Sequence, residues 1–306
     1  MQNTEIFNYS TKKINKVSYE FSREDTGDVS ANNLTKLRRK ASEDIVIVEQ
    51  PLQITLSWLE QGIVKNKVFT ITMRTPGYDY FLIIGLLHSE GVIKQLKNVE
   101  SIKLESEDVA GEGKYNEWLV KFTKGFIPDL SSLDRYMMSY SSCGLCGTTS
   151  LKTLQLKTDI NLSHSDHKNG LAAQSILLLS DKMRSEQGLF DQTGGVHGAA
   201  LFDSKLNMQQ LYEDIGRHNA VDKVVGALLA SDKFSEATPL WILLVSSRIS
   251  FEIVQKAIMA GISVLVGVGA PSDLAIQAAK QFDLTLIGFA SNKGFNVYHG
   301  DWRLTN

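Results

Sequence analysis

The spacing of apolar residues divides the chain into two halves of different character. Between residues 45 and 135, segments such as IVIVEQPLQITLSWLEQG alternate apolar and polar residues, as half-buried strands do. One apolar run at helical spacing, YDYFLIIGLLH, comes after the turn signal Pro76-Gly77. These patterns predict a small β-rich domain with one helix over residues 45–135.

The second half alternates buried strands with helices. LWILLVSS, SVLVGVG and LTLIGFA are continuous apolar runs, and FEIVQKAIMAG and SDLAIQAAKQFD separate them at helical spacing. Two further helices are predicted at residues 172–187 and 218–230, with two strands between them. This order predicts an α/β domain over residues 171–306, with a mainly parallel sheet and helices on both of its faces.

Two segments lie outside these domains. Residues 1–44 are polar and mixed in charge, which predicts a loosely ordered extension with one short strand at KVSYEFS. Residues 136–170 form a linker that holds both cysteines. The fold class expected for the chain is therefore α/β, or α+β when both domains are considered.

Composition excludes several functional classes. A hydrophobic content of 43% and a charged content of 22% are those of an ordinary globular protein. The net charge of -2 gives no electrostatic case for nucleic acid or a membrane surface as a partner. We expect no secretory signal and no membrane span, because no apolar run is long enough. With two cysteines in 306 residues, we expect a cytoplasmic protein.

The two cysteines lie close together in YSSCGLCGTT, at Cys143 and Cys146. A glycine stands directly after each cysteine and favours a mobile loop that other groups can approach closely. Three chemistries fit this pattern: exchange between a dithiol and a disulfide, half of a zinc site, and a thiolate that carries a group covalently.

Zinc is disfavoured because a tetrahedral site needs two more ligands and no other cysteine exists. His164 and His167 are the nearest pair of histidines, in a polar stretch typical of a solvated loop. HSE at residues 88–90 matches the upstream element of the base-deaminase zinc signature, but Ser142 stands where that signature has proline. We therefore predict no metal site.

Redox exchange is disfavoured by the segment after the loop, because TTSLKTLQLK is a poor start for the helix of a thioredoxin-type motif. Two ordinary cysteines without a role remain the plain alternative. A carrier or nucleophilic thiol is the best chemical interpretation.

Ionisable residues gather at a predicted junction between a strand and a helix, in YEDIGRHNAVDK. The positive end of a helix that starts near Arg217 and His218 favours an anion, and both side chains can add charge. Glu213 and Asp214 can hold a ribose or orient the histidine. A helix cap with surface charges is the alternative.

Three polar or Gly-rich loops come after the three buried strands, at residues 245–248, 267–272 and 288–294. Open α/β sheets bind ligands at the carboxyl ends of their strands, so a shared phosphate or nucleotide pocket is predicted there. Arg248 lies in the first loop. His197, in TGGVHG, is a further candidate, although a turn explains it equally well. Arg74 is more simply part of a turn.

Taken in order, six stretches resemble the formate dehydrogenase accessory sulfurtransferases, the FdhD family. They are RTPGYDYFLIIGLLHSEGVI, SSCGLCG, TGGVHGAAL, YEDIGRHNAVDK, SSRISFEIVQKAIMAGISVLVGVGAPS and GFASNKGFNVY. The resemblance as a whole runs from about residue 45 to residue 297. The resemblance implies a protein that takes sulfane sulfur from a cysteine desulfurase and holds it as a persulfide on the CxxC loop. The sulfur passes to the molybdenum bis(molybdopterin guanine dinucleotide) cofactor before that cofactor enters apo-formate dehydrogenase. The resemblance also implies a cytidine-deaminase-like α/β domain and a homodimer.

Carried onto this sequence, the persulfide falls on Cys143, with Cys146 as an auxiliary thiol. The cofactor-binding segment of the family falls on Phe289, Ala290, Ser291, Asn292, Lys293 and Gly294. Charge and placement add Arg217, His218, Arg248 and His197 as candidate contacts. Two other functions stay open: a non-catalytic cofactor chaperone for apo-formate dehydrogenase, and a zinc-stabilised nucleotide-binding domain.

Overall fold

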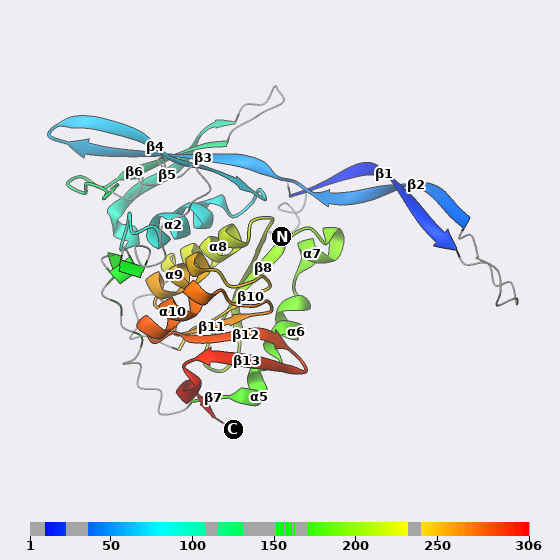
Figure 1. Cartoon of the computed structure of the whole chain (residues 1–306). Coiled ribbons are helices and arrows are strands. Elements are labelled where there is room, and N and C mark those ends of the chain that lie inside the picture. The colour runs from blue at the N-terminus through cyan, green and yellow to red at the C-terminus, as the bar shows by residue number, and fades with distance from the viewer. Residues whose placement is uncertain are drawn as a thin grey trace, which may run out of the picture.

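The computed structural model describes residues 10–22, 36–107, 116–130, 170–231 and 240–305, together with parts of 151–162. Cys143 and Cys146 lie outside the described residues. The described chain forms two sheets with helices between them, and a two-stranded arm projects from the body (Figure 1).

The first sheet has four strands in the order β4-β3-β6-β5. They are β3 (Gln50–Glu60), β4 (Ile63–Arg74), β5 (Val99–Glu107) and β6 (Asn116–Phe122). In the middle of β3, the alternate residues Leu52, Ile54 and Leu56 are buried. The helix α2 (Asp79–Ser89) shares their hydrophobic core. The predicted strands and the single long helix of this region are thus confirmed, with only the short 3₁₀ turn η1 (Leu96–Asn98) added among the described residues.

The second sheet has six strands in the order β13-β12-β11-β10-β8-β9. They are β8 (His197–Phe202), β9 (Met208–Asp214), β10 (Ile242–Val245), β11 (Val264–Gly267), β12 (Thr285–Ser291) and β13 (Gly294–His299). Only β10, β11 and β12 run parallel to one another, and the other three pairings are antiparallel. The prediction of a mainly parallel sheet is therefore wrong, and the sheet is mixed.

Short connections explain two of the antiparallel pairs, β8–β9 and β12–β13, because parallel neighbours need a crossover of a dozen or more residues. The β8–β9 turn is held by Asp203, whose carboxylate accepts N–H groups from Lys205 and Asn207. Only Asn292 and Lys293 separate β12 from β13, a strand that the sequence pattern did not predict.

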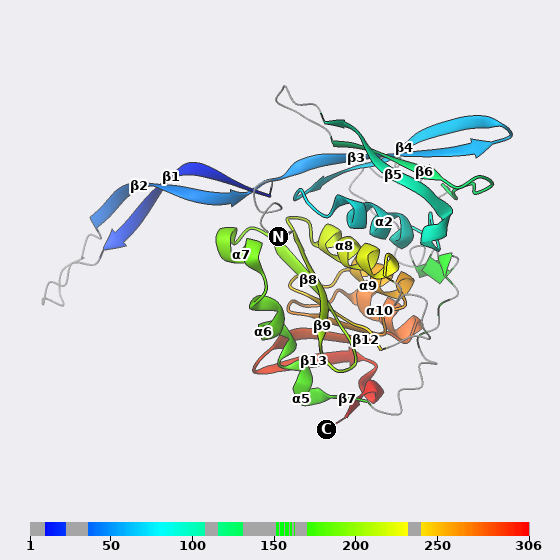
Figure 2. The same cartoon turned by 180° about the vertical axis from the view of Figure 1, so that it is seen from behind.

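Helices cover both faces of this sheet, as predicted (Figures 1 and 2). On one face lie α8 (Arg217–Leu229), α9 (Phe251–Met259) and α10 (Asp273–Gln281), and on the other α5 (Ala173–Ile176), α6 (Leu179–Arg184) and α7 (Gly188–Thr193). Leu243 faces the first group and Leu244 the second, since successive strand residues point to opposite faces. Near the C-terminus, β14 (Leu304–Thr305) pairs with β7 (Leu171–Ala172) after the turn η4 (Asp301–Arg303). The likeness to cytidine deaminases stays a prediction.

The two sheets share one hydrophobic core through the crossing of α2 and α8. Gly85 of α2 lies so close to α8 that an added Cβ would meet the carbonyl group of Asp222. Gly226 of α8 is equally close to the carbonyl group of Phe81. The crossing is thus a contact of backbone on backbone that only glycine permits.

The arm consists of β1 (Thr11–Ser22) and β2 (Lys36–Ile47), paired in antiparallel register (Figure 2). This corrects the prediction of a loosely ordered extension. Val17 and Tyr19 on one face are 44% and 57% exposed, and Ile14 on the other face is 38% exposed, so neither face of the arm is buried enough to impose a clear apolar period. The arm is fixed at its root, where Ser10 Oγ donates to the Pro76 carbonyl at 2.7 Å.

Among the described residues, no helix has both the length and the apolar character needed to span a bilayer.

We expect Gly226→Ala to lower the free energy of unfolding by about 1–3 kcal/mol, because the methyl group forces α2 and α8 apart. A urea titration measures this. Gly294→Ala is the matched control, since an added Cβ there has nothing within 4 Å. Equal urea midpoints of unfolding for Gly226→Ala and Gly294→Ala would show that the close contact of α2 and α8 does not contribute to stability.

Candidate functional site

A cavity of about 640 Å³ lies at the edge of the six-stranded sheet where β10, β11 and β12 end. The sheet side of the cavity is lined by His197, Ser246, Val268, Ala290, Ser291 and Asn292. These residues come from all three loops at the ends of the parallel strands and from the start of β8. The prediction that these loops share one pocket is confirmed.

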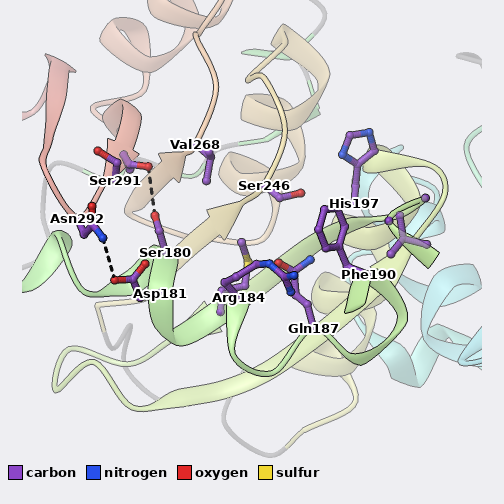
Figure 3. A pocket seen from close by; sticks show the side chains of 15 residues that line it. Ser180, Asp181, Arg184, Gln187, Phe190, His197, Ser246, Val268, Ser291 and Asn292 are labelled. Atoms are coloured by element: carbon purple, nitrogen blue, oxygen red, sulfur yellow. Dashed lines mark hydrogen bonds between the residues drawn. The ribbon is translucent and has the colours of Figure 1, made fainter. Parts of the chain in front are cut away.

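The opposite wall comes from α6 and α7, which no sequence motif linked to the site (Figure 3). Its polar or aromatic members are Ser180, Asp181, Arg184, Gln187 and Phe190. A signal for them existed, because Ser180, Arg184 and Gln187 recur at helical spacing within a segment predicted as helix.

Two hydrogen bonds hold α6 against the end of β12. Ser180 Oγ donates to the Ala290 carbonyl at 3.2 Å, and Asn292 Nδ2 donates to Asp181 Oδ2 at 3.4 Å. Ser291 in turn fixes the β12–β13 turn, because its Oγ donates to the Gly294 carbonyl at 3.1 Å. The turn therefore presents Ser291 and Asn292 to the cavity.

Arg184 is the cation of the cavity wall. Its guanidinium carbon lies 4.5 Å from the centre of the Phe190 ring, and it pairs with Asp191 at 2.6 Å. A guanidinium offers five donors in a planar fork, so it can bind a phosphate or carboxylate as well.

Six candidate residues do not line the cavity. They are Arg217, His218, Arg248, Phe289, Lys293 and Gly294. Phe289 is 49% exposed and has a φ of 56°, a left-handed backbone that is rare for aromatic residues. Backbone strain of this kind is concentrated at functional sites, so residues 289–294 remain a candidate binding segment. Arg248 is exposed on its loop. The binding roles of all these residues stay predictions.

The acidic pair before α8 serves the fold. Glu213 accepts the N–H groups of Leu189 and Phe190 at 2.8 and 3.0 Å, which fixes the start of α7 and thereby the Phe190 ring. Burial raises the pKa of Glu213. Asp214 is fully buried and pairs with Lys223 at 2.7 Å. The prediction of a ribose contact is therefore wrong for Asp214, which no ligand can reach.

Two histidines at this sheet edge have depressed pKa values. Burial lowers the pKa of His218 to about 4, and the charges of Lys256 and Arg217 add to that effect. Burial, together with the smaller effect of the Arg217 charge, also lowers the pKa of His197. Near neutral pH both rings are uncharged, so Arg217 rather than histidine can attract an anion here.

Two residues singled out in the first half are structural. The ring nitrogens of His88 lie 3.2 Å from the Ile93 carbonyl and 2.8 Å from the Met259 carbonyl, inside the core. Arg74 is buried and forms a two-pronged ion pair with Asp79. Among the residues that the structure describes, no group of three His, Cys, Asp or Glu side chains is arranged to hold a metal ion.

Comparison with known proteins adds independent evidence. The sequence matches the FdhD/NarQ family over residues 47–305. It is 40% identical over 263 residues to the sulfur carrier protein FdhD of Streptomyces avermitilis, which covers 85% of this chain and 89% of that protein. The protein of the same name from Sulfolobus acidocaldarius is 41% identical over 263 residues, or 85% and 91% of the two chains.

A solved structure supports the fold. The crystal structure of a proposed formate dehydrogenase accessory protein from Desulfotalea psychrophila superimposes with a TM-score of 0.62. The match covers 96% of this chain and 99% of that one at 21% sequence identity.

We expect the free energy of unfolding to fall as the pH is lowered from about 6.5 towards 4, because unfolded His218 binds a proton that the folded ring does not. Since the ring is only partly buried, the loss is about 1–2 kcal/mol rather than the full value of the shift. Urea titrations at pH 7 and pH 5 measure it. His218→Gln should flatten this dependence, and an unchanged slope in the variant would contradict the assignment.

Proposed function

The chain belongs to the FdhD/NarQ family, and on that premise we propose that it is a sulfur carrier with sulfurtransferase activity. It accepts sulfane sulfur from a cysteine desulfurase as a persulfide on Cys143. It transfers this sulfur to the molybdenum bis(molybdopterin guanine dinucleotide) cofactor, which apo-formate dehydrogenase then receives. The observation that carries the proposal is the identity of about 40%, over 85% of the chain, to relatives named sulfur carrier protein FdhD.

The thiol chemistry rests on the sequence. The thiolate of Cys143 attacks the outer sulfur of the donor persulfide, and the donor thiolate leaves. Cys146 can later attack the inner sulfur of the Cys143 persulfide, releasing the outer sulfur and leaving a disulfide. No other thiol exists in the chain to compete with these two.

The cavity supports the cofactor part of the proposal. Its volume suits a nucleotide-sized group, and its lining combines apolar surface with a few polar side chains, as small-molecule sites do. Ala290, Ser291 and Asn292 are the proposed contacts inside it, with Phe289, Lys293 and Gly294 beside it. Arg217, His218, Arg248 and His197 are proposed as further contacts along the sheet edge. The cofactor is cargo in this scheme, and no resident metal is proposed.

The remaining partners are proposed from family membership. We propose a homodimer that acts in the cytoplasm and meets the cysteine desulfurase and apo-formate dehydrogenase in turn. No nucleic acid or membrane takes part in this scheme.

A second candidate function is a cofactor chaperone without sulfur chemistry. It is favoured by one observation, namely that polar and aromatic side chains such as Asp181, Arg184 and Phe190 line the cavity and can bind a ligand without covalent chemistry. Such a protein would bind the cofactor and apo-formate dehydrogenase while the cysteines only shape their loop.

Intact-protein mass spectrometry tests the carrier function. After incubation with a cysteine desulfurase and free cysteine, we expect the wild type and Cys146→Ala to gain one sulfur atom. Cys143→Ala should gain none, because the receiving thiolate is absent. A gain that survives in Cys143→Ala, or no gain in the wild type, would overturn the assignment.

Complementation separates the two functions. In cells that lack the native gene, we expect Cys143→Ser to restore less than about a tenth of formate dehydrogenase activity, as loss of a covalent nucleophile predicts. Ser142→Ala, which changes the neighbouring hydroxyl, serves as the control. Full activity with Cys143→Ser would favour the chaperone.

A further inference from the structure

The cavity has two chemically different ends (Figure 3). Asp181 and Asn292 lie at one end, next to Ser180 and Ser291. Phe190 and His197 lie at the other, and Arg184 stands between the two groups. A ligand that spans the cavity therefore meets a carboxylate with an amide at one end and a cation with aromatic rings towards the other.

The carboxylate and the amide form a hydrogen-bonded pair. Asn292 Nδ2 donates to Asp181 Oδ2 at 3.4 Å, and the neighbouring bond from Ser180 to the Ala290 carbonyl ties the same two elements together. Within the described part of the chain, Asp181 has no ion-pair partner, whereas Arg184 pairs with Asp191. The pair therefore presents an acceptor beside a donor to the cavity.

This pattern complements the Watson–Crick edge of guanine. Guanine has two adjacent donors, N1–H and the 2-amino group, beside the acceptor O6. A carboxylate accepts from both donors, and an amide N–H donates to O6. Adenine presents an acceptor at N1 and a donor at C6, which leaves the carboxylate facing a lone pair. Hypoxanthine lacks only the 2-amino donor.

We infer that Asp181 is the residue that selects guanine in this cavity, with Asn292 as its partner and the phosphate directed towards Arg184. The inference rests on the proposed function and deepens it, since it states which base the site recognises and by which atoms. The reverse orientation would set the phosphate against Asp181 and is repulsive. Arg184 has donors to spare for a phosphate besides its bond to Asp191.

Isothermal titration calorimetry of the full chain with four nucleotides tests this. The wild type should bind guanosine monophosphate at least about tenfold more tightly than inosine monophosphate, since a site built for a donor rejects the analogue that lacks it. Adenosine monophosphate should bind more weakly than either.

The variant Asp181→Asn should lose at least about tenfold in affinity for guanosine monophosphate. It should also bind xanthosine monophosphate more tightly than the wild type does, because xanthine carries an acceptor at C2 that an amide can satisfy. A misfolded variant cannot produce that gain. Glu105→Gln is the control of equal charge change, on an exposed residue of β5 in the other sheet, and should bind all four nucleotides like the wild type.

Equal binding of guanosine and adenosine monophosphates by the wild type would overturn the inference. So would an unchanged affinity of Asp181→Asn for guanosine monophosphate, or no binding of any nucleotide by the wild type. Sulfur loading of Asp181→Asn, measured by mass spectrometry, should equal that of the wild type. If the wild type gains no sulfur, the proposed carrier function is wrong. If the wild type gains sulfur but does not prefer guanosine monophosphate, the role of Asp181 in base selection is wrong.

Discussion

The crossing of α2 and α8 is the contact on which the rest of the molecule depends. Gly85 and Gly226 bring the two backbones together, and the buried carboxylate of Asp222 adds polar bonds at the same place. It accepts a hydrogen bond from Ser89 of α2 at 2.9 Å and pairs with Lys256 of α9 at 2.8 Å. Removing one partner of a buried ion pair is costly because the other charge stays behind without compensation. These contacts hold α2, α8 and α9 in one arrangement, and both sheets pack against these helices.

That arrangement determines where the site can form. With α8 fixed, the ion pair of Asp214 and Lys223 joins the end of β9 to the middle of the helix. Lys223 also donates to the Thr75 carbonyl of the first half at 3.1 Å. Glu213, the next residue back, then fixes the start of α7 and the Phe190 ring. Glu213 and Asp214, which the sequence suggested as ligand contacts, thus have a structural role. They position elements that line the cavity.

The extent to which the sequence predicts the structure depends on the range of the interactions. Strands and helices that bury one face repeat their apolar residues at a regular spacing, so the sequence predicts them. The loops after β10, β11 and β12 could be placed at one sheet edge because the carboxyl ends of parallel strands meet there. The arm was missed because its strands bury no face. The cavity wall from α6 was missed because Asp181 and Asn292 are 111 positions apart and meet only through tertiary packing. The expected strand directions were wrong for part of the second sheet, because apolar runs alone do not distinguish a buried antiparallel strand from a parallel one.

The cavity bears on how a sulfur carrier of this kind can work. Every described residue that lines it lies between positions 180 and 292, C-terminal to both thiols in the sequence. In the proposed scheme, a thiol takes sulfur from the donor enzyme and the side chains of this cavity hold the cofactor that receives it. When the cofactor is bound in a pocket, the transfer of sulfur from the thiol to the cofactor becomes a reaction between groups within one complex. This is the main advantage that a binding pocket gives to a covalent carrier. In the proposed scheme, the two different ends of the cavity also fix which way the bound group points. Base selection by Asp181 and delivery of sulfur then both depend on that one orientation.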